Sequence, residues 1–454
     1  METYAKRGGS SWNAPGGGTN WPTMTFREMY SYSTAGQVTG KRLKVSGLYS
    51  GAYAVATDFL ESSYTFDNEG RMTRHIYPAA QVGGAEVGGT DLNYGFDAMG
   101  RLNTLLSPGL ISGVTYNAAG QPTAINSAHP LVNSETRVYN VLGQMTSLTN
   151  GLRFEYDFPA TGNDGRITAQ RTYSASNTLV ETNTYNYDSL SRLTAASGGG
   201  WNATYGYDGF TNLLTVAGTG PSLMNITVNP TNNRVNGWTY EANGNVTQQG
   251  SFSGSYDVEN RLSEASKNGA VRYGYRADNR RIYESKRGTE NAGGDTIEEF
   301  VTYWDAGRRM CLYKMVWATT PNSFVFAKAE ENLYFGPKAL RLGPITGYDW
   351  PLAVDRLGSI RRGSGKDHFP YGQENPSTTA GDKEKYATYR HAAATDLSYA
   401  DQRYYATGTG RFMTADPAGD GLNWYAYVGG DPVNGSDPRG ERIEWLLGGA
   451  AACA

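Results

Sequence analysis

The chain has 454 residues, with 40 lysine and arginine residues against 43 aspartate and glutamate residues and a formal net charge of -3. No basic run is long enough to follow a phosphate backbone, so nucleic acid is not an expected partner. The 58 glycines and 33 tyrosines favour an all-β protein in which tyrosine supplies apolar surface, and two cysteines, Cys311 and Cys453, are too few for a disulfide framework.

The two ends of the chain show no targeting or membrane segment. Residues 1–21 contain no apolar core of a signal peptide and no amphipathic basic helix. No stretch reaches the about 20 apolar residues that a membrane-spanning helix needs. We therefore expect no membrane span, and we interpret both ends as cut, so that the chain is a fragment or an orphan copy.

One unit recurs from about Tyr64 to about Arg281. It consists of an aromatic residue, an aspartate or asparagine, two or three further residues, a glycine or asparagine, and then a polar and an apolar residue. The copies read YTFDNEGRMT from Tyr64, YGFDAMGRLN from Tyr94, TYNAAGQPT with Tyr116, VYNVLGQMT with Tyr139, YNYDSLSRLT from Tyr185, YEANGNVT from Tyr240, YDVENRLS from Tyr256 and YRADNRRI from Tyr275.

Each part of this unit favours a β-hairpin. Alternation such as Tyr185-Asn186-Tyr187 places aromatic rings on one face of a strand, because strand side chains repeat with period two. The aspartate or asparagine that follows bonds the backbone two residues on, and glycine or asparagine tolerates positive φ, so together they reverse the chain. Hairpins that pair edge to edge give one continuous sheet, which must curl to bury its aromatic face and protect its edges. The sequence thus predicts an all-β spiral of hairpins.

These copies resemble the YD repeats of RHS proteins, of Tc-toxin C subunits, of bacterial wall-associated YD proteins and of the teneurin extracellular shell. The resemblance implies that the hairpins form a hollow β-shell, which in the toxin families encloses a C-terminal effector. It divides the chain into a partial N-terminal shell segment (residues 1–60), the YD-repeat shell (61–300), an RHS repeat-associated core (301–440) and a truncated tail (441–454).

The C-terminal third contains LSYADQRYYATGTGRFMTADP from Leu397 and NWYAYVGGDPVNGSDPRG from Asn423, which closely resemble the RHS repeat-associated core. In that family the core closes the shell as a plug, and many members cut the chain just after the second Asp-Pro-x-Gly motif. The two motifs here begin at Asp416 and Asp437.

Two carboxylates held close in a site with little water cannot both ionise, so such a pair can act as acid and base in peptide hydrolysis. Asp416 and Asp437 are the candidate pair, and Arg403 matches an arginine that assists it in the Tc-toxin branch. The bond to be cut would be Gly440–Glu441 or Glu441–Arg442. The alternative is that both Asp-Pro motifs are turns that lock the plug, since aspartate accepts backbone hydrogen bonds and proline fixes φ.

The leading functional interpretation is a secreted or cell-surface shell of a polymorphic toxin, whose partners would be its own C-terminal effector or that effector's immunity protein. The second is an extracellular adhesion module whose tyrosine-rich outer face binds carbohydrate. The third is an autoproteolytic aspartyl core, which acts on its own chain and not on a free substrate. The four histidines are scattered without the spacing of a metal site, so we expect no metal and no other cofactor.

Overall fold

The computed structural model describes residues 2–6, 23–46, 59–82, 85–107, 109–287, 297–318, 323–343, 352–361, 367–375, 381–419 and 421–446. The regular elements in these ranges are β-strands, apart from one short 3-10 helix, η1 (Val428–Gly430). The all-β prediction is therefore confirmed. Residues 447–454, with Cys453, and much of the predicted 1–60 segment lie outside the described residues.

The first two large sheets contain seven and eleven antiparallel strands. The seven-stranded sheet consists of β1 (Glu2–Lys6), β2 (Thr23–Tyr32), β3 (Val38–Ser46), β4 (Phe59–Phe66), β5 (Met72–Ile76), β8 (Asp91–Phe96) and β9 (Leu102–Ser107). The eleven-stranded sheet consists of β10 (Gly113–Tyr116), β11 (Pro122–Asn126), β12 (Glu135–Tyr139), β13 (Met145–Thr149), β14 (Arg153–Asp157), β15 (Ala169–Tyr173), β16 (Leu179–Tyr187), β17 (Leu193–Gly198), β18 (Trp201–Tyr207), β19 (Leu213–Thr219) and β20 (Met224–Asn225).

A third large sheet has nine strands. They are β21 (Thr239–Tyr240), β22 (Val246–Gln249), β23 (Phe252–Tyr256), β24 (Leu262–Ser266), β25 (Ala270–Tyr275), β26 (Arg281–Arg287), β27 (Ile297–Asp305), β28 (Arg308–Ala318) and β29 (Ser323–Glu331). The smaller sheets pair β6 (Ala80–Val82) with β7 (Ala85–Val87), β30 (Leu333–Phe335) with β31 (Lys338–Arg341), β32 (Ala353–Val354) with β33 (Ile360–Arg361) and β39 (Gly435–Ser436) with β40 (Glu444–Trp445). A five-stranded sheet contains β34 (Lys383–Glu384), β35 (Arg390–Ala392), β36 (Leu397–Ala400), β37 (Arg403–Ala406) and β38 (Arg411–Phe412).

The strands of the large sheets pair in chain order, as a row of hairpins requires. The one continuous sheet that the repeat predicted is divided into three. Between β9 and β10, Gly109 adopts a φ of 80° and a single bridge, Leu105 to Ile111, replaces the ladder. Between β20 and β21 lies Pro230, which has no N–H to donate to a ladder. The hairpin repeat itself is confirmed.

The geometry of the turn explains the aspartate that recurs in the repeat. In the hairpin β16–β17, Oδ1 of Asp188 accepts hydrogen bonds from the backbone N–H groups of Leu190 (3.0 Å) and Arg192 (2.9 Å), and Oδ2 accepts one from Arg192 Nε at 2.8 Å. Ser191 holds the positive φ, 71°, that glycine or asparagine holds in other copies. One carboxylate thus satisfies the N–H groups that the turn leaves unpaired.

Neighbouring repeats are joined by an arginine–aromatic contact. The guanidinium of Arg192 lies 4.9 Å from the ring centre of Tyr207 in the next hairpin, and the Tyr207 hydroxyl donates to the Leu193 carbonyl at 2.8 Å. The same stacking joins other neighbours in pairs, Arg71 with Phe96, Arg101 with Tyr116 and Arg261 with Tyr275. The arginine of the repeat therefore serves two hairpins, its own turn and the following strand.

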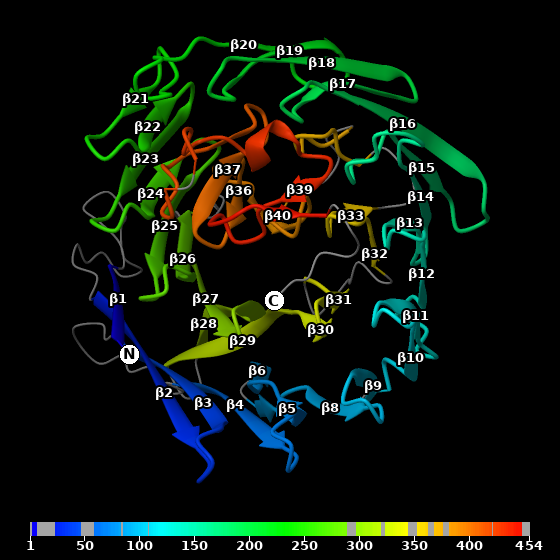
Figure 1. The fold of residues 1–454 in the computed structure, drawn as a ribbon. Helices are drawn as coiled ribbons and strands as arrows, with labels where there is room; N and C mark the ends of the chain where they lie inside the picture. Colours follow the sequence, from blue (N-terminus) through cyan, green and yellow to red (C-terminus); the bar gives the residue numbers. More distant parts are fainter. Residues whose placement is uncertain are drawn as a thin grey trace.

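The strands follow one another around a closed outline, and the C-terminal elements lie inside it (Figure 1). We call β1–β29 the shell and residues 352–446 the plug. The first and third sheets meet where β1 contacts β25 and where Tyr303 donates a hydrogen bond to the Lys41 carbonyl at 3.0 Å. The predicted arrangement of a hairpin shell closed by a C-terminal plug is confirmed.

The shell and the plug share hydrophobic cores. A single buried cluster contains Phe154 and Tyr205 of the shell together with Tyr405 and Tyr427 of the plug. Among the described residues the only tyrosines with exposed side chains are Tyr30 and Tyr32. The rings of the repeat thus face inward, and the described outer surface is not rich in tyrosine. Cys311 is buried and free.

Candidate functional site

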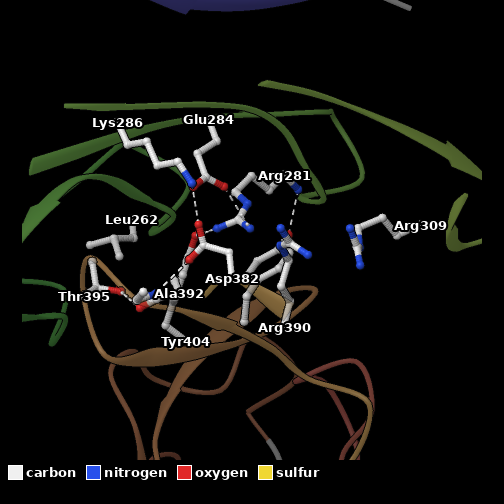
Figure 2. Close-up of polar contacts among 12 residues, drawn as sticks. Leu262, Arg281, Glu284, Lys286, Arg309, Asp382, Arg390, Ala392, Thr395 and Tyr404 are labelled. Carbon is white, nitrogen blue, oxygen red and sulfur yellow. Dashed lines mark hydrogen bonds and ion pairs between the residues drawn. The ribbon is translucent and has the colours of Figure 1, made fainter. Parts of the chain in front are cut away.

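Buried and partly buried ion pairs hold the plug against the shell (Figure 2). Arg390 on β35 binds Glu330 on β29 through two hydrogen bonds of 2.8 and 2.9 Å. Asp382, just before β34, contacts Lys286 Nζ on β26 at 2.5 Å. Burial opposes ionisation of Asp382, but the charges of Lys286 and Arg390 outweigh it and lower its pKa to about 2. The pairs are therefore charged at neutral pH, and they fix the orientation of the five-stranded sheet that positions the site.

Arg403 is the centre of the candidate site. It is the first residue of β37, and its side chain is almost fully buried. Its Nη2 lies 2.9 Å from Asp437 Oδ2 and 3.9 Å from Asp416 Oδ1. The structure therefore brings together the three residues that the sequence proposed, with the guanidinium between the two carboxylates.

Asp437 is the more buried of the two carboxylates, with 2% of its surface exposed. Burial raises its pKa above the ordinary value, against the opposing charge of Arg403. Its Oδ1 accepts hydrogen bonds from the backbone N–H groups of Glu441 (2.9 Å) and Arg442 (3.0 Å). The hydroxyl of Tyr389 donates to its carbonyl at 2.5 Å. Both carboxylate oxygens and the carbonyl oxygen of Asp437 thus accept hydrogen bonds.

Asp416 lies closer to the surface, at the edge of a pocket. Its Oδ1 accepts the N–H of Ala418 at 3.0 Å, which closes the first Asp-Pro turn. The pocket has a volume of about 370 Å³, and its lining includes Asp416, Asp437, Arg403, Phe210 and Leu422. Water can therefore reach Asp416 from this pocket, and Asp437 lines the same pocket but is more deeply buried.

The segment after Asp437 presents one peptide bond to these groups. Arg403 Nε donates to the Gly440 carbonyl at 2.6 Å, while Asp437 Oδ1 lies beside the N–H of Glu441. Gly440 has a φ of 68°, and a Cβ there would lie 2.6 Å from the Ala400 carbonyl oxygen. Glycine is therefore required at this position by both backbone conformation and space. Of the two candidate bonds, only Gly440–Glu441 has its carbonyl bonded by Arg403 and its N–H bonded by Asp437 in the described contacts.

Sequence reasoning missed two features of this region. Tyr207-Asp208 is a further copy of the repeat, hidden because Thr211 holds the positive φ, 63°, and Asn212 stands where other copies have arginine. Asp401, in the turn between β36 and β37, has a pKa raised to about 7 by burial, against the charge of Arg280. Only its spacing from Arg403 could have drawn attention to it.

In the part of the chain that the structure describes, no group of three or more histidine, cysteine, aspartate or glutamate side chains is placed to hold a metal ion. Nor does any helix in those ranges have the length and apolar character needed to cross a bilayer.

Comparisons with known proteins agree with this architecture. No protein-family model matches the chain. The toxin subunit YenC2 of Yersinia entomophaga is 25% identical over 424 residues, which cover 74% of this chain and 43% of that protein. The tRNA nuclease WapA of Bacillus subtilis (strain 168) is 27% identical over 292 residues, covering 55% of this chain and 11% of that protein. The chain thus spans less than half the length of either relative.

Solved structures show the same fold over nearly the whole chain. The crystal structure of TcdB2-TccC3 superposes with a TM-score of 0.69 at 19% identity, covering 93% of this chain and 24% of the matched chain. The Photorhabdus luminescens Tc holotoxin pore gives the same TM-score at 18% identity and covers 95% of this chain and 24% of the matched chain. The chain therefore has the β-shell fold of these Tc-toxin structures, and its hairpin repeat and enclosed plug are similar to those of RHS-type toxin proteins.

Proposed function

We propose that this shell encloses a C-terminal effector of a toxin and that the plug separates the effector from the wall. The observation that carries the proposal is the closed outline of strands around residues 352–446 (Figure 1). Relatives of the chain are named as a toxin subunit and a tRNA nuclease, and the chain covers 43% and 11% of their lengths. An effector would follow the plug in the longer protein, and its immunity protein would be the second partner. Such a protein would act outside the producing cell, as a secreted or cell-surface molecule.

A protection experiment tests enclosure. A short flexible peptide with a protease site is attached after Ala454, and the same peptide is attached before Met1 in a matched protein. Both carry Asp437→Asn, so that the C-terminal peptide stays covalently attached. Enclosure predicts that the C-terminal peptide is cut much more slowly than the N-terminal one in the folded protein and at the same rate in urea. Equal rates in the folded protein would contradict it.

The geometry around Arg403 supports a second function, cleavage of the chain at Gly440–Glu441. Asp416 accepts a proton from a water molecule of the pocket, and the oxygen of that water attacks the Gly440 carbonyl carbon. Arg403 Nε stabilises the negative charge on the carbonyl oxygen. Asp437, whose raised pKa favours the protonated form, gives its proton to the Glu441 nitrogen as the C–N bond breaks. The products are a Gly440 carboxylate and a free Glu441 amine.

Cleavage is tested on the purified chain extended by a reporter, by denaturing gel and by the mass of the new C-terminus. We expect a fragment that ends at Gly440, and loss of that fragment in Asp416→Asn and in Asp437→Asn. Asp431→Asn is the matched control, because Asp431 is also buried before a proline in the plug but contacts Asn434. An uncut chain would leave the turn-forming role as the function of both Asp-Pro motifs.

A further inference from the structure

One hairpin of the shell departs from the repeat where it meets the plug. In the hairpin β18–β19, Asn212 occupies the position that Arg192 occupies in the preceding hairpin. Asn212 is fully buried, whereas Arg192 remains partly exposed. The plug supplies the missing guanidinium: Arg411, 2% exposed, reaches Asn212 Oδ1 at 2.7 Å through Nη1 and the Asn233 carbonyl at 2.6 Å through Nη2.

Asn212 uses every hydrogen-bonding position of its amide. Its Nδ2 donates to two shell atoms, Asp208 Oδ2 at 2.7 Å and Asn233 Oδ1 at 2.8 Å. Its Oδ1 accepts from two plug atoms, Arg411 Nη1 at 2.7 Å and Asn423 Nδ2 at 2.8 Å. An asparagine side chain offers two donor hydrogens and two acceptor lone pairs, so all four hydrogen-bonding positions of Asn212 are used. Two of these bonds are to the shell and two are to the plug.

The plug side of this contact continues into the candidate site. Asn423 Nδ2 also donates to the Phe210 carbonyl at 3.1 Å, and Asn233 Nδ2 donates to the Leu422 carbonyl at 3.0 Å. The backbone before Trp424 is therefore held by shell side chains and shell backbone. The Trp424 carbonyl in turn accepts a hydrogen bond of 3.0 Å from Arg403 Nη1.

We propose that Asn212 is a positioning residue that couples docking of the plug on this hairpin to the geometry of Arg403. Through Asn423 and Trp424 it fixes the guanidinium against Asp437 and the Gly440 carbonyl. The chain then acquires its cleavage geometry only after the shell has formed around the plug. This inference rests on the proposed cleavage at Gly440–Glu441.

The sharpest variant is Asn423→Asp. It keeps the Oδ1 that accepts the Tyr425 N–H at 3.1 Å, and it removes the two donors to Phe210 and Asn212. We expect the cleavage rate to fall by about 10–100-fold, since a small misplacement of a catalytic group has effects of this size. The matched control is Asn245→Ala, because Asn245 is 1% exposed and its side chain bonds Glu241 and Asn260, both in the shell.

The pH profile separates positioning from general destabilisation. The alkaline limb of the rate profile reports loss of the Asp437 proton. The ionisable groups around Asp437 are Arg403, Asp416, Tyr389, Glu441, Arg442 and Glu444. A loosened Arg403 opposes protonation less, so the limb of Asn212→Ala, which adds no charge to the pocket, moves to higher pH. Asn245→Ala keeps the wild-type profile whatever its melting temperature.

Asn212→Ala gives an independent check, because it cuts the same link from the shell side. The double variant with Asn423→Asp is expected to be no slower than the slower single variant. Wild-type rate and profile in both single variants would overturn the inference while leaving cleavage intact. A wild-type chain that is never cut would remove the cleavage proposal itself, and the positioning role with it.

Discussion

The shell and the plug are built from different kinds of contact. In the shell, Asp188 binds an arginine four residues away, and that arginine stacks on the neighbouring hairpin. In the plug, Arg411 binds Asn212 from 199 positions away and Arg390 binds Glu330 from 60 positions away. The shell thus repeats one local solution, whereas the plug depends on unique contacts between distant segments.

This difference predicts where the molecule is sensitive to substitution. Local contacts in the shell are partly hydrated, and each copy has equivalents elsewhere. The contacts of the plug are buried, so an uncompensated charge there has no access to water. Four measurements order the two regions by the free energy of unfolding.

The largest effect is expected from Glu330→Gln. Glu330 accepts hydrogen bonds from Arg390 and from Arg309 Nη1 at 2.7 Å, and all three side chains are buried. Removing the carboxylate charge leaves Glu384 to pair with both buried guanidinium groups, at a cost of up to about 3–5 kcal/mol. Urea denaturation followed by tryptophan fluorescence measures the loss. A loss below about 1 kcal/mol would show that the plug is not held by these pairs.

Asp401→Asn tests the plug through its pH dependence. The folded-state pKa of Asp401 is raised to about 7, so the folded protein binds a proton that the unfolded chain releases above about pH 4. The wild type therefore loses stability as pH rises from about 4 to about 7, by roughly 2–4 kcal/mol from this group, and the variant does not. Denaturation midpoints at several pH values measure the difference between the two proteins. The half-exposed Asp396, changed to asparagine, is the control, and a wild-type curve parallel to that of Asp401→Asn would contradict the assignment.

Asp188→Ala tests a single copy of the shell turn. The substitution removes the acceptors of two backbone N–H groups and of Arg192, all partly hydrated, so we expect a loss of about 1–2 kcal/mol. Denaturation of the variant beside Asp188→Asn, which keeps Oδ1, separates the backbone bonds from the ion pair. Equal losses in the two variants would assign the whole effect to the charge.

Glu61→Gln sets the lower limit of the comparison. Glu61 pairs with Arg42 at 2.7 Å on the outer face of the shell, and both side chains are exposed by more than two fifths. Such a pair contributes about 0–1 kcal/mol and is screened by salt. A melting temperature that shifts by more than that of the Asp188→Ala variant would reverse the order proposed for these two shell contacts.

The sequence predicts the shell because each hairpin is determined by neighbouring residues. Asp97 and Arg101 form one contact within four positions, and the bond from Arg101 holds the pKa of Asp97 below its ordinary value. The repeat pattern does not identify the Asp208 copy, because Asn212 stands in place of arginine. Asn212 bonds the plug, and a local sequence pattern does not show a contact with a distant segment. For the same reason the motifs identify Asp416 and Asp437, but only the folded chain shows that Arg403 lies between them.

The arginine–aromatic contact gives the wall a direction along the chain. A hairpin with the arginine presents a guanidinium to an aromatic ring of the next hairpin, so the contact between such neighbours is asymmetric and has the same direction at each step where the pair is kept. A tandem duplication or deletion of whole hairpins upstream would therefore keep the same arginine–aromatic contact between neighbours. The hairpin β18–β19 is the exception, because its Asn212 bonds the plug. This hairpin must therefore stay opposite the plug, however many hairpins precede it.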